Sequence, residues 1–267
     1  MTPSVLTRSA RALLVAVVVS LPLFASPVAH AIVNIEDMRG DKVPEGFSGQ
    51  FALDAGGERG NTDRSSLGVG ARTQWKYGRT LDFIVFNYNS GQTNGQRDVN
   101  NGFVHARHID PLTPTTAWEA FTQAGQNEFQ RLSYRALIGG GGRFTLYRSS
   151  DQGSELLVGA GAFYEREELD EAPGTTDAGI ETTTRANLYV VFNYRLNDHV
   201  RIQSTTYYQP SFSDVDDFRG IEQATLLVKL ADRLDLKLQV DAAYDSRPPQ
   251  LVERGDLVYR TGIEYRF

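Results

Sequence analysis

The chain has 267 residues, of which 22% are charged and 10% aromatic, with 25 glycines and two methionines. It contains no cysteine, so disulfide bonds, thiol redox chemistry and cysteine-ligated metal centres are excluded. The formal net charge of −6 argues against nucleic acid as a partner. This length and composition are compatible with one large all-β unit.

Residues 1–31 have the three regions of a secretory signal peptide. Arg8 and Arg11 give a positive start, residues 13–24 are almost entirely apolar, and an Ala-x-Ala cleavage pattern ends at Ala31. An N-terminal membrane anchor is the alternative, but this apolar run is shorter than the roughly 20 residues that a spanning helix needs. Removal of the peptide leaves 25 basic against 33 acidic residues, a net charge of −8.

In the rest of the chain, apolar and polar residues alternate with the period of two that strands require. In the clearest case, residues 234–245, Leu236 and Val240 share one face while Lys237 and Asp241 share the other. An even number of strands returns both chain ends to the same side, as bacterial single-chain barrels require. Twelve strands are predicted, near residues 47–55, 65–76, 80–89, 98–110, 116–124, 128–147, 155–166, 182–195, 200–212, 222–230, 234–245 and 257–267.

Two aspects of this pattern stay open. In residues 80–89, Leu81 and Phe83 compete with Ile84 and Phe86 for the apolar face, so the orientation of that strand is undetermined. Alternation also does not say which face points inward. A soluble twelve-stranded sandwich with an apolar interior is therefore the alternative to a membrane barrel with an apolar exterior.

Connection lengths and aromatic placement favour the barrel. Outer-membrane barrels pair short periplasmic turns with longer outside loops and carry aromatic girdles near both strand ends. Aromatic residues fall near both ends of the last predicted strands, and no second apolar stretch is long enough for a membrane helix. Reading back from the C-terminus, the predicted connections are alternately long and short: 246–256, 231–233, 213–221, 196–198 and 167–181. The predicted connection 125–127 is an exception, because it is short where a long outside loop is expected.

The sequence thus predicts a cleaved signal peptide (1–31), a periplasmic lead (32–45) and a transmembrane antiparallel up-and-down β-barrel of about 12 strands (46–267) in the cell outer membrane. The expected partners are outer-membrane lipid and lipopolysaccharide.

Several short motifs point the same way. They are Gly-Phe-Ser-Gly at 46–49, Phe-Val-His-Ala-Arg-His at 103–108, Trp-Glu-Ala-Phe at 118–121 and Asn-Leu-Tyr at 187–189. These motifs resemble the salt-induced outer-membrane proteins grouped as domain of unknown function 481, and the likeness extends from about residue 34 to 267. The resemblance implies an outer-membrane barrel and brings no catalytic motif or substrate.

The C-terminal residues Tyr265 and Phe267 look like the aromatic signal by which the barrel assembly machinery recognises its precursors during biogenesis. An ordinary interfacial phenylalanine at the end of a last strand is the alternative.

The polar face of the predicted barrel carries both signs of charge. We favour a salt-bridged filling, which would make the barrel a structural or envelope-stress component, because buried charges must be paired. An anion-leaning channel for small solutes is the alternative. The candidate lumen-lining residues are Arg131, Arg135, Arg143, Arg185, Arg195, Arg201, Glu119, Glu165, Lys237, Asp241, Arg260 and Glu264.

Nothing in the sequence proposes catalysis, a metal or a cofactor. His105 and His108 are three residues apart and so point to opposite faces of a strand, and His199 lies beside a turn. A lipid-acting enzyme is the least favoured function, because no histidine accompanies an activated hydroxyl in a recognisable motif.

Two further features have simple interpretations. The acidic loops 167–181 and 213–221 are expected to be solvated, with divalent-cation binding as the alternative. The four glycines at 139–142 are expected to allow a bend, or the close approach of an inward side chain.

Overall fold

The computed structural model describes residues 45–149, 153–232 and 234–265. The predicted signal peptide, the predicted lead up to residue 44, and Phe267 lie outside the described residues. The described part of the chain is all-β and contains no α-helix. Accordingly, no helix in this part has the length and apolar character needed to cross a membrane.

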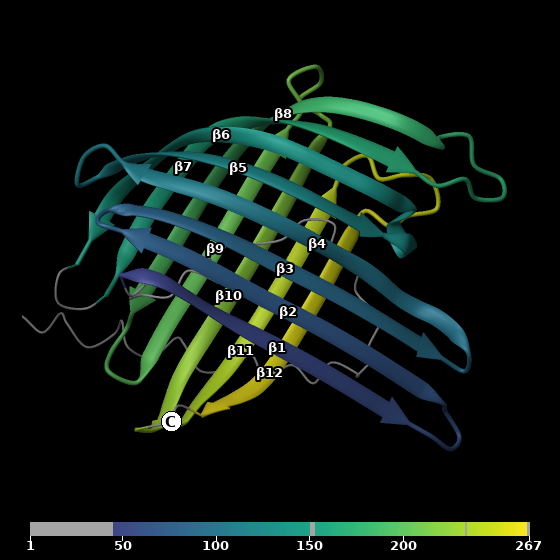
Figure 1. The fold of residues 1–267 in the computed structure, drawn as a ribbon, viewed down its shortest axis with the longest axis horizontal. Coiled ribbons are helices and arrows are strands. Elements are labelled where there is room, and N and C mark those ends of the chain that lie inside the picture. The colour runs from purple at the N-terminus through teal and green to yellow at the C-terminus, as the bar shows by residue number, and fades with distance from the viewer. Residues whose placement is uncertain (1–44, 150–152, 233, 266–267) are drawn as a thin grey trace, which may run out of the picture.

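Twelve antiparallel strands form one sheet in which every strand pairs with its neighbours in the sequence, which confirms the predicted up-and-down order. The sheet curls, so that β1 to β5 pass in front of β9 to β12, with β6 to β8 along the top (Figure 1). The strands are β1 Gly46–Glu58, β2 Arg64–Tyr77, β3 Thr80–Thr93, β4 Gln96–Pro111, β5 Thr116–Asn127, β6 Leu132–Arg148, β7 Glu155–Leu169, β8 Gly179–Arg195, β9 Val200–Pro210, β10 Phe218–Ala231, β11 Leu234–Asp245 and β12 Gly255–Tyr265.

The sheet is open in this structure. β1 and β12 form its two edges, and no pairing between them occurs in the described residues. From Phe51 onwards every residue of β1 is exposed, whichever face it occupies. Two long unpaired edges offer free N–H and C=O groups to any neighbouring strand.

The predicted boundary between the fifth and sixth strands is wrong. The sequence analysis places a connection at 125–127 and a strand from residue 128, whereas β5 continues to Asn127 and a 3-10 turn, η1, occupies Glu128–Gln130. The Asn127 side chain accepts the N–H of Phe129 at 3.2 Å and so caps this turn. Arg131 follows in the left-handed region, with φ of 57°, and β6 begins only after it.

The predicted alternation of connection lengths holds only in the C-terminal half. There the long connections 170–178, 211–217 and 246–254 alternate with the short connections 196–199 and 232–233. In the N-terminal half, β3 and β4 are joined by Asn94 and Gly95 alone, on the side of the long connections. Both residues have positive φ, 51° and 77°, as a type I′ hairpin turn requires.

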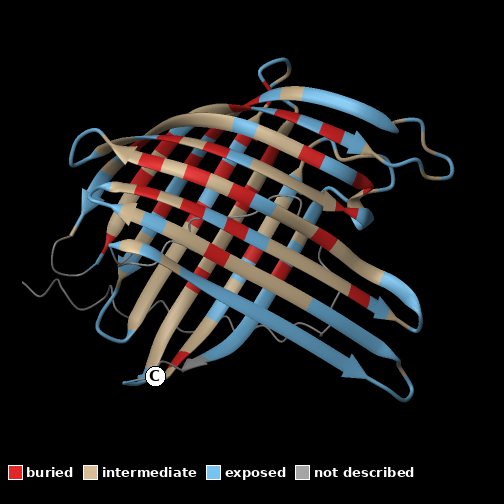
Figure 2. Cartoon of the chain, viewed as in Figure 1, coloured by how far each residue is buried: buried red, intermediate tan, exposed pale blue. Residues whose placement is uncertain are grey.

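The apolar face of the sheet is the exposed one. Leu53, Trp75, Ile138 and Leu257 are each between 59% and 65% exposed, whereas buried positions recur in bands across the strands (Figure 2). Many of the buried positions are charged or polar, so the interior is the polar face. A sandwich with an apolar interior has the opposite arrangement.

The orientation of β3, which the sequence left open, follows the same rule. Ile84 and Phe86 are outward and exposed, while Leu81, Phe83 and Val85 are buried. The three buried side chains pack with Ile109 of β4 into a small interior cluster. Apolar residues therefore occupy both faces of this strand, which explains why alternation alone could not orient it.

Aromatic side chains gather near both ends of the outer face. At the ends of the strands that lead into the long connections, the ring of Phe218 lies 5.4 Å from that of Tyr208 and 5.7 Å from that of Tyr244. At the opposite ends, Phe192 stacks on Tyr194 at 5.8 Å. The rows of aromatic residues predicted from the sequence are present on the exposed face.

Glycines allow close packing on the buried face. Gly159 of β7 lies directly opposite Tyr189 of β8, and a Cβ added at Gly159 would lie 2.0 Å from the tyrosine ring. Within the predicted glycine run, a Cβ at Gly139 would lie 2.7 Å from the Phe121 ring. The predicted approach of an inward side chain to this run is confirmed, and the glycine at 159 lets Tyr189 lie across the interior.

We predict that Gly159→Ala lowers the free energy of unfolding by about 1–3 kcal/mol, because the added methyl group displaces the Tyr189 ring. Urea unfolding of the refolded protein measures the change. Gly220→Ala is the matched control, since a Cβ at this strand glycine meets nothing within 4 Å. Equal stability of the two variants would show that the tyrosine does not depend on this glycine.

Candidate functional site

The charged interior of the sheet is the candidate functional site, and Glu119 is one of its two centres. This β5 carboxylate is 2% exposed and accepts the hydroxyl of Tyr189 at 2.7 Å. Arg143 and Arg107 each donate to Glu119 Oε2, at 3.2 and 3.3 Å. Arg143 also donates to the Tyr189 hydroxyl at 3.0 Å, and its guanidinium lies 5.5 Å from the centre of that ring. One carboxylate thus joins β4, β5, β6 and β8.

Glu165 of β7 is the second centre and is also 2% exposed. It accepts a hydrogen bond from Arg185 Nε at 2.7 Å. Arg219 Nη1 donates to both oxygens of Glu165, at 3.0 Å each. Arg219 comes from β10 on the other side of the curled sheet, and its Nη2 also donates to Glu167 at 3.0 Å. Arg135 of β6 completes the group through an ion pair with Glu167.

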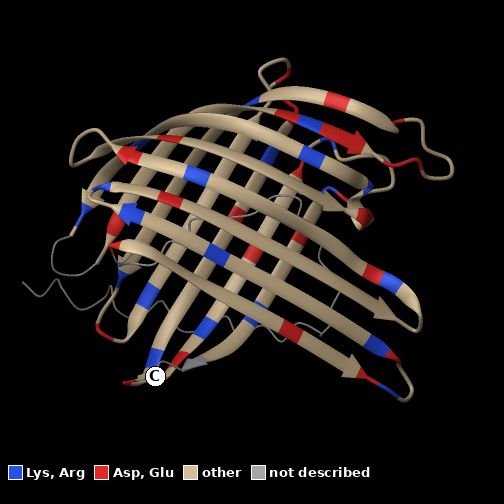
Figure 3. Cartoon of the chain, in the orientation of Figure 1, with Lys and Arg blue, Asp and Glu red and all other residues tan. Residues whose placement is uncertain are grey.

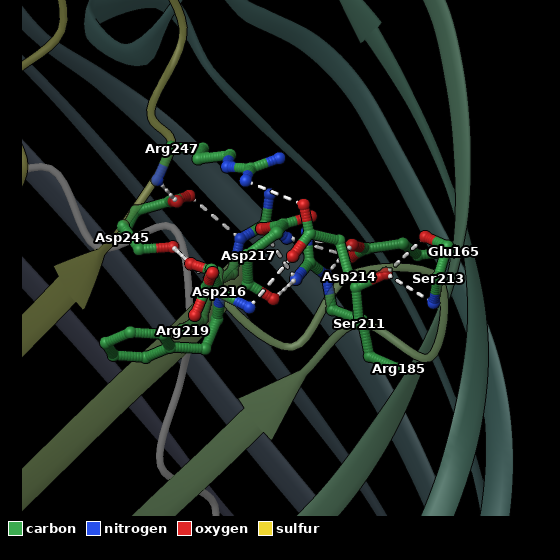
Figure 4. A network of polar contacts seen from close by, with 12 residues as sticks. Glu165, Arg185, Ser211, Ser213, Asp214, Asp216, Asp217, Arg219, Asp245 and Arg247 are labelled. Atoms are coloured by element: carbon green, nitrogen blue, oxygen red, sulfur yellow. Dashed lines mark hydrogen bonds and ion pairs between the residues drawn. The ribbon is translucent and has the colours of Figure 1, made fainter.

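Residues from the long connections extend this network. Both terminal nitrogens of Arg185 donate hydrogen bonds to the carboxylate of Asp217, in the connection 211–217, at 3.0 Å (Figure 4). Arg219 Nε donates to the carboxylate of Asp245 at 2.9 Å. Bidentate arginine–carboxylate pairs of this kind combine strength with fixed geometry. The long-connection ends of β7, β8, β10 and β11 are therefore tied together from within.

These findings correct part of the interpretation of the acidic loops as solvated, whereas Glu168, Asp170, Glu171 and Asp216 are exposed as expected. Glu167 is buried within β7, and Asp217 faces Arg185. Asp177 of the connection 170–178 accepts Arg131 Nη1 at 2.8 Å and the backbone N–H of Gln250 at 2.7 Å. At least three of the acidic residues therefore serve as counter-ions for interior or loop arginines.

The centre of the interior is nearly full. A cavity of about 40 Å³ lies among side chains that include His105, Phe121, Glu165 and Arg219. One water molecule needs about 10–15 Å³ of such space, so this cavity holds only a few. Beside it, Tyr189 packs with apolar neighbours into a second interior cluster of Leu157, Tyr189, Val191, Tyr207 and Ile221.

The predicted lumen residues fall into three groups. Glu119, Arg135, Arg143, Glu165 and Arg185 lie together in the buried network, and charge of both signs follows the strands (Figure 3). Arg131 is buried but lies before β6, where it joins two long connections. The others lie nearer the edges or ends of the sheet: Arg195, Arg201, Lys237, Asp241 and Arg260, with the side chain of Glu264 outside the described residues.

Sequence reasoning missed several members of the network. Arg219 was assigned to a connection, although it lies two residues before Ile221 and four before Gln223 on the same phase of β10. Extending the period of two backwards would have found it. Arg107 was noticed only within a motif. Its partners Glu119 and Phe121 both come from the neighbouring strand β5, which no local pattern indicates.

The two histidines of β4 have different surroundings. His105 is buried between the rings of Phe83 and Phe121, whereas His108 is on the outer face with Nδ1 2.6 Å from Asp82. They therefore point to opposite faces, as predicted. In the parts of the chain that the structure describes, no group of three or more His, Asp or Glu side chains could hold a metal ion.

The fold and the site together define an all-β protein with a twelve-stranded antiparallel sheet. A network of charged side chains lies on the buried face of this sheet. A family model described as protein of unknown function, DUF481, matches residues 53–267. The chain belongs to this family, which confirms the resemblance seen in its motifs. Comparisons with curated proteins and with solved structures gave no match.

We predict that Glu119→Gln lowers the free energy of unfolding by about 3–5 kcal/mol, because two buried arginines lose their counter-ion. Glu128→Gln is the control. Its partner Arg97 is exposed, so the expected loss is about 0–1 kcal/mol. Urea unfolding compares the two variants, and a loss for Glu119→Gln no larger than for the control would contradict a stabilising role for this cluster.

Asp177 gives a pH-dependent contact between two long connections. The backbone N–H of Gln250, followed by the side chain of Arg131, holds the pKa of this carboxyl below its usual value. A lowered pKa in the folded state means that the contact is present above the ordinary carboxyl pKa of about 3.9 and is lost as pH falls through the lowered value.

We therefore predict a lower protection factor for the Gln250 amide in Asp177→Asn at neutral pH, and in the unmodified protein only when the pH falls below the lowered Asp177 pKa. NMR-detected hydrogen exchange measures both. Asp63→Asn, in the distant connection between β1 and β2, is the control and should leave this amide unchanged. Unaltered protection in Asp177→Asn would rule out the contact.

Proposed function

We propose that this protein is an outer-membrane β-barrel and that its filled interior makes it a structural or envelope-stress component. The observation that supports the proposal most directly is the inverted distribution of side chains, apolar outside and charged inside. Lipid would cover the exposed apolar face, and the aromatic residues near both ends would lie at the two interfaces. Lipid and lipopolysaccharide are then the partners of this face.

A membrane barrel must be closed, and the registers of the sheet support closure by β1 and β12. A row of residues can be followed across the sheet from each residue to its Cα partner on the next strand. The row that starts at the beginning of β1 reaches the end of β11, which lies next to the beginning of β12. Closure therefore needs a stagger of about one strand length, as tilted barrel strands require. The Cα partners run through Gly46, Lys76, Leu81, Ile109, Glu119, Gly141, Gly161 and Asn187. The Asn187 side chain accepts Gln209 Nε2 of β9 at 2.9 Å, and the Cα partners continue from Gln209 to Arg219 and Asp245.

The faces of the two edges also match. Phe47 and Leu53 of β1 point outward, as do Leu257 and Tyr259 of β12, and all four have odd numbers. Antiparallel pairing of Phe47 with Tyr265 places Leu53 opposite Tyr259. Outward residues then meet outward residues along the whole junction, which is the condition for one continuous apolar wall.

We predict that Leu53→Cys combined with Tyr259→Cys forms an intramolecular disulfide after refolding into lipid vesicles. The chain has no other cysteine, so mobility on non-reducing gels reports this bond alone. Asp54→Cys with Tyr259→Cys is the control, because these side chains would lie on opposite faces. Absence of the Leu53–Tyr259 bond at this register and at the neighbouring one, Leu53 with Thr261, would contradict closure.

The filled interior favours a structural barrel over the small-solute channel. We predict no steady conductance when the refolded protein is inserted in a planar bilayer, because buried ion pairs cross the interior and the central cavity has room for only a few water molecules. Protease protection of the inserted protein controls for insertion. A steady conductance that loses its anion preference in Arg135→Glu would establish the channel instead.

A further inference from the structure

Two arginines face one another on the inner side of the sheet at the end of β8. Arg195, the last residue of β8, and Arg201, the second residue of β9, are direct Cα partners. Both lie on the inward phase of their strands, with Arg185 and Thr205. Like charges directly opposite one another on the same face destabilise a sheet. An anion bound between them would remove this cost.

A cavity of about 250 Å³ lies at this position, beside the connection 196–199. It is several times larger than the space at the centre of the interior. Its charged lining consists of three permanent cations, Arg195, Arg201 and Lys229, against the carboxylates of Asp198 and Asp235. The side chains of Asn197 and His199 complete the polar part of the wall.

The carboxylates paired with two of these cations are exposed to water. Arg195 Nη2 lies 2.9 Å from Asp198, whose side chain is 88% exposed, and Lys229 Nζ lies 2.9 Å from Asp232, which is 97% exposed. Exposed pairs of this kind are weak and readily exchanged. The arginines of the Glu119 and Glu165 clusters differ in this respect, because their counter-ions are 2% exposed.

The connection that borders the cavity has a defined conformation. Asn197 Oδ1 accepts the backbone N–H groups of His199 at 2.8 Å and Val200 at 2.9 Å. These two bonds fix the turn between Arg195 and Arg201. The two guanidinium groups are thus carried by the ends of paired strands, which positions them before any ligand arrives.

We infer that this cavity is a binding site for a small soluble anion with phosphate or carboxylate groups. Arg195 and Arg201 supply planar donor pairs that match such groups, and Lys229 adds a compact positive charge. The site lies on the inward face, away from the apolar wall, and is blind because the buried network and the apolar cluster around Tyr189 fill the interior beyond it. It is independent of the proposed function, since it needs the folded sheet and not the membrane.

Isothermal titration calorimetry of the purified chain, refolded in uncharged detergent, with inorganic phosphate tests this inference. We expect saturable binding that weakens at least tenfold in Arg195→Gln and in Arg201→Gln. Arg148→Gln is the matched control. Arg148 ends β6 at the same end of the sheet, is paired with Glu155, and lies outside the cavity.

A stability measurement separates binding from folding. Because Arg195 is paired with an exposed carboxylate, we expect Arg195→Gln to leave the free energy of unfolding without phosphate nearly unchanged. Native-like affinity in both glutamine variants, equal weakening in Arg148→Gln, or no saturable binding by the unmodified chain would overturn the assignment.

A third arm identifies the source of the anion. Phosphate binding that persists equally in nanodiscs of phosphatidylcholine and of phosphatidylglycerol supports a soluble ligand. Phosphate binding abolished only by phosphatidylglycerol would overturn the soluble source and assign the site to a lipid headgroup.

Discussion

The structure depends on the requirement that buried charge be neutralised in place. Glu119 and Glu165 are almost completely buried, and each is held by at least two arginines from other strands. Removing such groups from water is so costly that they persist only with partners on every side. Because successive residues of a strand point to opposite faces, strands that turn these charges inward turn apolar residues such as Ile138 and Leu257 outward. The charged interior and the apolar exterior are two results of one constraint.

The same network connects strands on opposite sides of the curled sheet. Arg219 reaches across from β10 to Glu165 and Glu167 on β7, and Asp217 brings the connection 211–217 against Arg185. Long connections would otherwise be the most mobile part of a sheet of this kind. Here their acidic residues are counter-ions of interior arginines. Ion pairs that cross the interior support the structural role proposed above over a conducting one.

Much of the fold could be predicted from the sequence because strand formation is recorded locally. The alternation of Leu236 and Val240 with Lys237 and Asp241 identifies a strand and its two faces without any tertiary information. The local sequence does not indicate which charged side chains pair with one another across the interior. Nothing near Arg219 in the sequence indicates Glu165, which is 54 residues away. The 3-10 turn after Asn127 was missed for a related reason, since a side-chain cap replaces the alternating pattern there.

The account rests on the apolar face being in contact with lipid, and the two tryptophans report on that contact. Trp75 and Trp118 are the only tryptophans of the chain, and both lie on the exposed face, at 59% and 40% exposure. The most direct measurement is quenching of their fluorescence in vesicles that contain lipids brominated along the acyl chain. The account predicts strong quenching after refolding, greater than that produced by a water-soluble quencher. Tryptophans quenched from water and not from the acyl chains would contradict a membrane barrel.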